Sequence, residues 1–236
     1  MTRKKYAWVS FLAILALLTF AALAPAQAEF TLETSPALST LQIPNALVDR
    51  LDAQGSRILH RQDTVCDVWW LKSLSAVPST SSEPDILYGS LQPGALVGLL
   101  RFVSSSAEDT RDQKLKPGLY TMRYALIPQD GNHMGVSEYR DFVLLSPLSA
   151  DTELDKVLSF DDLVNLSRKA SGTGHPAVIS LAAPNPAYKK LPALVQDDQG
   201  NCSLQVDLRE NPTGGAAQDV KLAILLVTAP KESGGS

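Results

Sequence analysis

The sequence predicts a mainly β protein, an antiparallel β-sandwich of the immunoglobulin-like or jelly-roll kind with one short helix. Three observations support this prediction. Short stretches with strand-like alternation of apolar and polar residues recur along the 236-residue chain. Loops rich in Pro, Gly, Ser and Asp separate these stretches. A single segment combines helical spacing with capping residues at both ends.

The first elements follow the N-terminal region. Residues 29–44 are punctuated by Ser, Thr and Pro, so we expect a lead-in arm with at most a short edge strand at 30–32. A pair of strands is expected at 55–60 and 64–72, with a polar turn between them. Both faces of the second strand are partly apolar, which predicts a central position in its sheet.

The other strands are separated by polar loops, including a Ser- and Pro-rich loop at 73–85. The strand at 119–127 has the clearest pattern, because Tyr120, Met122 and Tyr124 fall on one face at period two. The expected ranges are 95–103, 119–127, 139–145, 177–182, 191–196, 203–208 and 220–228.

The one predicted helix begins after Ser159 and ends before Gly172. Ser159 can cap its N-terminus, and the two acidic residues that follow favour the positive end of the helix dipole. Two basic residues near the other end have the matching effect, and Gly172 can adopt the left-handed conformation that closes a helix.

Residues 1–28 have the features of a signal peptide. Three basic residues open the chain, an apolar run covers 7–24, and Ala26-Gln27-Ala28 has the small-x-small form of a cleavage site. The alternative is a retained membrane anchor, because the apolar run is nearly long enough to span a bilayer. The expected organisation is a signal peptide at 1–28, a lead-in arm at 29–44, one sandwich domain at 45–230 and a polar tail at 231–236.

The charge of the chain restricts its partners. Cleavage after residue 28 would remove three basic residues and no acidic ones, so the formal charge would fall from −4 to −7. A mildly acidic surface disfavours nucleic acid, which requires clustered Lys and Arg. We therefore expect a periplasmic or secreted protein whose partner is an envelope ligand or protein, with no nucleic acid and no membrane after cleavage.

Two cysteines, Cys66 and Cys202, remain after the leader. Export to an oxidising compartment favours a disulfide between them. The alternative is a pair of buried free thiols. A redox motif is not indicated, because the chain contains no Cys-x-x-Cys.

Two glycine-rich loops contain the candidate binding residues. The first has Asp130, Asn132 and His133, and the second, at 172–176, has His175. Glycines let such loops turn tightly and present side chains outward. If the loops lie at the same end of the domain, His133, His175 and Asp130 could hold zinc or copper. The alternative is that each His hydrogen-bonds to its own loop and stabilises its shape.

Trp69 and Trp70 lie side by side in a predicted strand, so their rings face opposite sides. Trp70 is a candidate for a ring that contacts a sugar or the apolar surface of a partner. The alternative is that the helix or a loop covers it.

No common catalytic motif is present, whether Gly-x-Ser-x-Gly, His-Glu-x-x-His or a phosphate-binding glycine loop. The expectation is a non-catalytic protein without a cofactor, which binds a ligand or partner through residues 130–134 and 172–176. A metal-binding envelope protein is the first alternative. A hydrolase whose triad comes from distant loops is the second.

Four segments, 91–102, 116–135, 141–145 and 166–178, resemble an uncharacterised family of exported bacterial β-sandwich proteins. The shared features are Pro-Gly-x-Tyr, then Asp-Gly-Asn-His-Met-Gly at 130–135, then a helix that ends in Ser-Arg-Lys before Gly-x-His-Pro-Ala-Val. The resemblance implies a sandwich fold and an envelope location. It implies no activity and no ligand.

Overall fold

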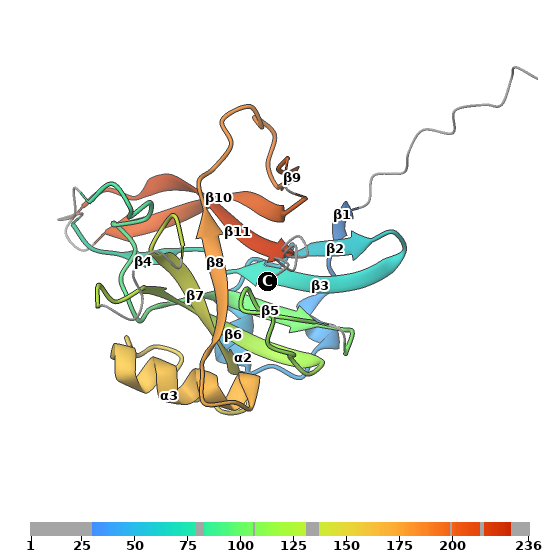
Figure 1. Cartoon of the computed structure of the whole chain (residues 1–236), viewed down its shortest axis with the longest axis horizontal. Helices are drawn as coiled ribbons and strands as arrows, with labels where there is room; N and C mark the ends of the chain where they lie inside the picture. Colours follow the sequence, from blue (N-terminus) through green and yellow to red (C-terminus); the bar gives the residue numbers. More distant parts are fainter. Residues whose placement is uncertain are drawn as a thin grey trace, which may run out of the picture.

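The structure is a computed structural model that describes residues 30–78, 83–105, 107–130, 137–198, 200–212 and 215–227. Figure 1 shows one curved sheet with a helix packed at its lower side. The strands are β1 (Phe30–Thr34), β2 (Ser56–His60), β3 (Asp63–Trp70), β4 (Leu74–Ala76), β5 (Leu96–Phe102), β6 (Gly118–Leu126), β7 (Asp141–Pro147), β8 (Ala177–Ala182), β9 (Ala193–Gln196), β10 (Cys202–Pro212) and β11 (Gln218–Val227). The helical elements are η1 (Leu38–Thr40), α2 (Asn45–Val48) and α3 (Phe160–Ser171).

The prediction of a mainly antiparallel β fold is confirmed. Ten of the eleven strands in the described sheet form one hydrogen-bonded path in the order β1-β2-β3-β5-β6-β7-β8-β11-β10-β4, and β9 pairs with β10 beside this path. Of these pairings, β4 with β10 is parallel. The sheet is nearly closed and does not divide clearly into the two sheets of the predicted sandwich.

The sheet is nearly closed because the chain continues from β3 into β4, which pairs with a distant strand. After Trp70 the chain crosses three residues and resumes as β4, which pairs with the far end of β10. The strand therefore joins the first part of the sheet to the last. Opposite this junction, β8 and β11 share only two residue pairs, and the Tyr88 hydroxyl extends the contact. It donates to the Ala182 carbonyl (2.8 Å) and accepts from the Ala223 N–H (2.9 Å).

The inner face of the curved sheet forms the main core. Strand alternation and the pairing register place apolar side chains from eight strands on this face. They include Ile58, Cys66, Val68, Trp70, Leu100, Met122, Val143, Ile179, Leu204 and Ile224. Burial of this surface is the main source of stability for the sheet.

Two segments cover the outer face. The chain between β1 and β2 packs Leu47 and Leu51 into the same cluster as Trp69. On the other side, α3 packs on β7 and buries Leu163 against Phe142 and Leu144. The structure thus has a second α-helix, the four-residue α2, in addition to the one that was predicted. It was not predicted because it is short and no side chain caps its N-terminus.

The ends of α3 are as predicted. The Ser159 hydroxyl accepts from the Asp162 N–H (3.2 Å), which satisfies one of the free donors of the first turn. Gly172 closes the helix with φ +66° and donates its N–H to the Arg168 carbonyl (2.9 Å).

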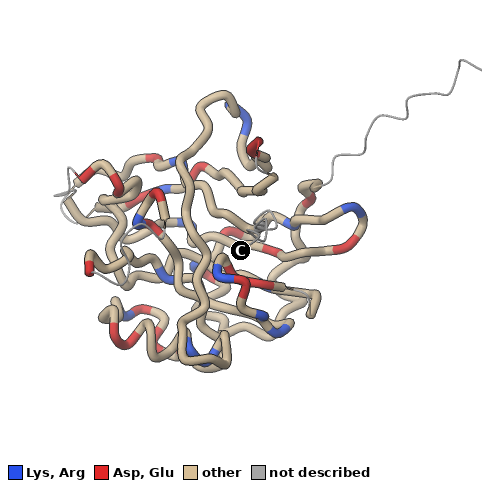
Figure 2. Tube along the Cα trace, viewed as in Figure 1, with Lys and Arg blue, Asp and Glu red and all other residues tan. Residues whose placement is uncertain are grey.

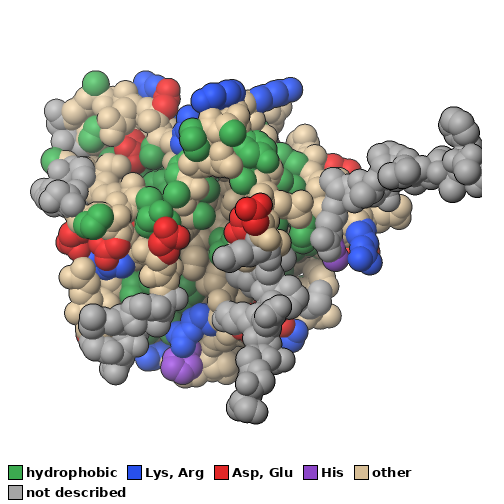
Figure 3. Space-filling model, turned by 45° about the horizontal axis from the view of Figure 1, so that its top comes forward, with side chains coloured by type: hydrophobic (Ala, Val, Ile, Leu, Met, Phe, Trp, Pro, Cys, Tyr) green, Lys and Arg blue, Asp and Glu red, His purple; other side chains and the backbone are tan. Residues whose placement is uncertain are grey.

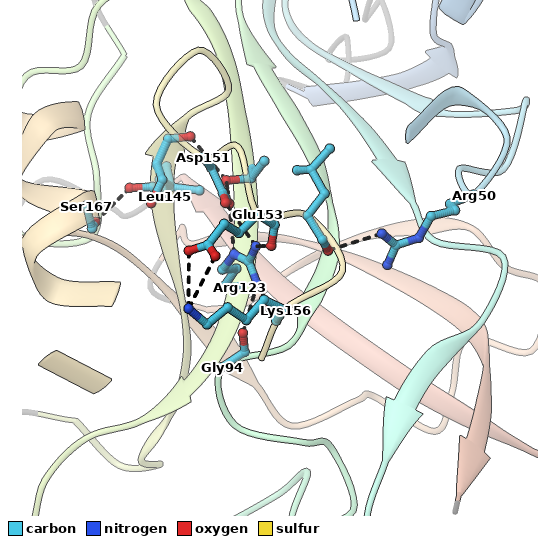
Figure 4. Close-up of polar contacts among 11 residues, drawn as sticks. Arg50, Gly94, Arg123, Leu145, Asp151, Glu153, Lys156 and Ser167 are labelled. Carbon is cyan, nitrogen blue, oxygen red and sulfur yellow. Dashed lines mark hydrogen bonds and ion pairs between the residues drawn. The ribbon is translucent and has the colours of Figure 1, made fainter. Parts of the chain in front are cut away.

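A buried charged side chain, Arg123, holds the loop between β7 and α3. Its guanidinium bonds both carboxylate oxygens of Asp151 (2.8 and 2.9 Å) and three carbonyls, those of Gly94, Glu153 and Lys156 (Figure 4). Arg50 reaches the same loop from the other side and bonds the Leu154 carbonyl (3.1 Å). Every nitrogen of Arg123 has an acceptor, so this cluster is structural.

The predicted disulfide is not formed. Cys66 on β3 and Cys202 at the start of β10 are free thiols, and both are buried. The alternative, a pair of buried free thiols, describes the structure.

Within the described residues, no helix has the length and apolar character needed to cross a membrane. The apolar leader lies outside this range.

Candidate functional site

The two predicted binding loops leave the sheet at opposite ends of β7. The loop that contains Asp130 follows Leu126, which pairs with Asp141 at the start of β7. The loop that contains His175 precedes Ala177, which pairs with Leu145 near the other end. The four residue steps from Asp141 to Leu145 separate the two ends by about 13 Å. The structure therefore does not bring Asp130 and His175 together.

The other two residues of the first loop, Asn132 and His133, lie outside the described residues. Figure 3 shows histidine side chains at two separate places on the face it presents. Within the described residues, no group of three or more His, Cys, Asp or Glu side chains is arranged to hold a metal ion. No metal centre can therefore be built from the residues that the structure places.

The loop at 172–176 is stabilised by its own hydrogen bonds. The Thr173 hydroxyl accepts from the His175 N–H (3.0 Å) and donates to Gln113 Oε1 (2.7 Å). The Ser171 hydroxyl donates to the His175 carbonyl, and Arg168 Nε donates to the Gly174 carbonyl (2.8 Å). The bonds to His175 are formed by its backbone N–H and carbonyl, and its imidazole is exposed. The alternative in which the His side chain itself stabilises the loop therefore does not explain the shape of this loop.

Neither tryptophan is an exposed platform. Trp69 is fully buried under the covering segment, and Trp70 is 5% exposed and faces the inner side of the sheet. Trp70 is covered, as in the alternative to its candidate binding role, because both faces of β3 are packed against other parts of the chain. In the described part of the chain neither indole N–H has a hydrogen-bond partner.

Trp70 nevertheless borders the cavity that we identify as the candidate site. This cavity has a volume of about 610 Å³ and is partly open. It lies where β3 passes into β4, against the middle of β10. Its walls come from Asp52, Gln54 and Ser56 and from the ranges 70–72, 191–192 and 206–209, with Asp219 and Lys221 of β11 at the rim.

The cavity marks a gap in the sheet. Along one edge of β10, β9 pairs with Cys202 through Gln205, and β4 pairs with Glu210 through Pro212. Among the described residues, none forms a partner strand on that edge for the four residues between these pairings, 206–209. All four line the cavity.

The lining combines apolar and charged side chains. Val206 and Leu208 face the interior with Trp70, and they are buried. Asp207 and Arg209 face outward and form cross-strand ion pairs with Lys221 (2.8 Å) and Asp219 (2.9 Å). The charged side chains of these pairs are about half exposed or more, so they remain accessible from solvent.

Charge elsewhere on the surface is mixed. Figure 2 shows acidic and basic residues scattered among each other over the described trace. A second ion cluster, in which Arg57 and Arg101 bond the buried Asp67 (2.7 and 2.8 Å), is satisfied across three adjacent strands. This cluster stabilises the sheet and leaves no open binding position.

The sequence did not identify this cavity as a site. Of the predicted binding residues, only Trp70 lines the cavity. It was a candidate as a ring that contacts a sugar or the apolar surface of a partner, and not as part of a cavity. A strand was predicted at 203–208, and nothing in its sequence distinguishes a strand paired on both edges from one with a gap.

In comparisons with known proteins, no protein-family model, no curated protein and no solved structure matches this chain. The resemblance to an exported bacterial family therefore stays a prediction.

Proposed function

We propose that this chain is an exported, non-catalytic binding protein that holds its ligand in the cavity beside β10. The cavity at the gap between β9 and β4 is the observation that carries the proposal. Ligand sites in proteins have volumes of roughly 300–1,000 Å³ and combine apolar walls with a few polar groups. The cavity of about 610 Å³ has that size, and its lining combines six apolar residues with eight polar or charged ones, so it is more polar than most such sites.

Residues 1–28 indicate the compartment in which the protein would meet its ligand. The basic start, apolar run and Ala-x-Ala site of residues 1–28 support export. The proposed ligand is then a molecule of the periplasm or the extracellular medium. This role replaces the predicted binding through residues 130–134 and 172–176, because these loops leave opposite ends of β7.

The lining indicates an amphipathic ligand. Its apolar part would lie on Trp70, Val206 and Leu208, and its charged part would reach the rim, where Lys72, Arg209 and Lys221 are basic and Asp52, Asp207 and Asp219 are acidic. Burial of apolar surface would supply most of the affinity, and the rim charges would orient the ligand.

A fluorescent probe of this kind tests the proposal. The anionic naphthalene dye 1-anilinonaphthalene-8-sulfonate should bind the folded protein at one site, with a rise in its emission. Gln54→Trp places an indole over the cavity from an exposed position and should weaken binding at least tenfold. Ala53→Trp adds the same group at an exposed neighbour that does not line the cavity, and should leave the affinity unchanged.

Two outcomes would contradict the proposal. One is the absence of dye binding to the folded wild-type protein. The other is equal dye affinity in the wild-type, Gln54→Trp and Ala53→Trp proteins, which would place the dye elsewhere.

A further inference from the structure

The unpaired edge of β10 has the geometry of a place for one more strand. In a β-strand the N–H and C=O of one residue point to the same edge, and those of the next residue point to the other. Of the four residues 206–209, two therefore direct their backbone groups at β11 and two direct them into the cavity. Backbone groups on a free strand edge are a template for pairing with another chain.

The gap fits a short segment. It spans five residue steps, from Gln205 to Glu210, or about 17 Å. It is bounded at one end by Leu191 and Pro192, which lead into β9, and at the other by Leu71 and Lys72, which lead into β4. About four extended residues can pair there before the incoming chain must leave the sheet.

The bounded gap excludes a second copy of this chain as the occupant through its own β10. That strand has 11 residues. A partner strand of this length would collide with β9 and β4, because both occupy the same edge of β10 on either side of the gap. The occupant must be a short extended segment with free flanks.

The side chains of β10 specify the occupant further. Residues directly opposite each other in a sheet face the same side and interact. Apolar residues would therefore lie opposite Val206 and Leu208, a basic residue opposite Asp207 and an acidic residue opposite Arg209. Read in the antiparallel direction, this pattern is acidic-apolar-basic-apolar.

Trp70 provides a second observation at the same place. The residue is 5% exposed and borders the cavity, whereas its indole nitrogen is itself inaccessible to solvent. An incoming segment would therefore meet the ring of Trp70 and not its N–H. An apolar side chain of the segment could pack on this ring.

We propose that the ligand of the cavity is an extended peptide segment of about four residues, with alternating apolar and charged side chains, that pairs with β10 between β9 and β4. This inference rests on the proposed binding function and specifies its ligand class. Such strand addition obtains affinity from the backbone and specificity from alternate side chains.

The probe is the peptide acetyl-Gly-Glu-Leu-Lys-Val-Gly-amide, titrated into the protein without residues 1–28 and followed by intrinsic tryptophan fluorescence and by amide hydrogen exchange. On binding, two alternate amides within 206–209 should exchange at least tenfold more slowly, because the incoming strand accepts their hydrogen bonds. The neighbouring amides that face β11 should change little, because they are already bonded.

Two control peptides separate the backbone from the side chains. Methylation of every peptide nitrogen from Glu to Val keeps the side chains and should weaken binding at least tenfold. Replacement of the Glu and Lys by Ser should weaken it by about two- to fivefold for each residue, as expected for cross-strand pairs.

Failure of this inference differs from failure of the proposed function. If the naphthalene dye binds at the cavity while the peptide does not bind, the cavity is a small-molecule site and the peptide inference is overturned. It is also overturned if the peptide binds without slowing any amide of 206–209, or if the N-methylated peptide binds equally well.

Discussion

At the scale of single residues, Arg123 shows how a charge is stabilised within this fold. Its side chain and that of Asp151 are both essentially inaccessible to solvent. Five hydrogen bonds, to one carboxylate and three carbonyls, compensate for the loss of hydration. The pair fixes the 148–158 loop, which lies between β7 and α3.

Removal of this guanidinium should be strongly destabilising. Arg123→Met leaves Asp151 buried without its cation, and we expect the free energy of unfolding to fall by about 3–5 kcal/mol. Urea denaturation measures the change. Arg50→Ala, which removes an ion pair with the exposed Asp155, should cost less than about 1 kcal/mol. A loss below 1 kcal/mol in Arg123→Met would contradict a stabilising role for the cluster.

The two thiols give a pH-dependent prediction. Burial raises the pKa of Cys202 from its ordinary value of 9.0 to about 11. Burial, with smaller contributions from the charges of Asp67 and Cys202, raises the pKa of Cys66 as well. Between pH 9 and 11 the unfolded chain therefore loses thiol protons that the folded chain retains. Each thiol should lower the free energy of unfolding by about 1.4 kcal/mol per pH unit in this range.

In the double variant Cys66→Ala/Cys202→Ala, the free energy of unfolding should decline less steeply over the same pH range. The remaining decline comes from other groups, such as the buried Tyr88 and Tyr124, whose pKa values are also raised. Equal pH slopes in the variant and the wild type would refute the assignment. Thiol counting supplies a second check. Two thiols should react in the unfolded, non-reduced protein, and fewer than two would indicate an oxidised pair.

At the scale of elements, the C-terminal end of α3 allows the energetic cost of a left-handed backbone conformation to be measured by itself. Gly172 has φ +66° and open space around the position of a Cβ. Gly174, two residues later, also has open space but no such conformation. Gly172→Ala should therefore destabilise the protein by about 1 kcal/mol through backbone strain alone.

Gly174→Ala is the matched control and should change stability by less than about 0.5 kcal/mol. Thermal denaturation of both variants gives the comparison. Equal melting temperatures for the two variants would show that the left-handed closure of α3 contributes nothing.

Local sequence patterns predicted some strands of the sheet and missed others. The strands at 119–127 and 203–208 were predicted because alternation records burial on one face. The three-residue β4 was assigned to the loop at 73–85, because its partner strand, β10, is more than a hundred residues away in the sequence. Partners at that separation leave no local periodicity.

At the scale of the whole molecule, the order of strands decides where candidate residues meet. The loops of Asp130 and His175 were predicted to converge on the basis of composition alone. The pairing of β7 with both β6 and β8 places them at opposite ends, and no periodicity contains that information. The cavity was missed for the same reason, because its walls combine four distant parts of the chain.

Amide chemical-shift mapping shows directly whether the gap along β10 binds the ligand. The protein without residues 1–28 is labelled with ¹⁵N and titrated with the naphthalene dye. We predict that the largest shifts fall on residues 52–56, 70–72 and 206–209, with small changes in the loop at 172–176. Shifts concentrated in that loop, with none along β10, would contradict the account.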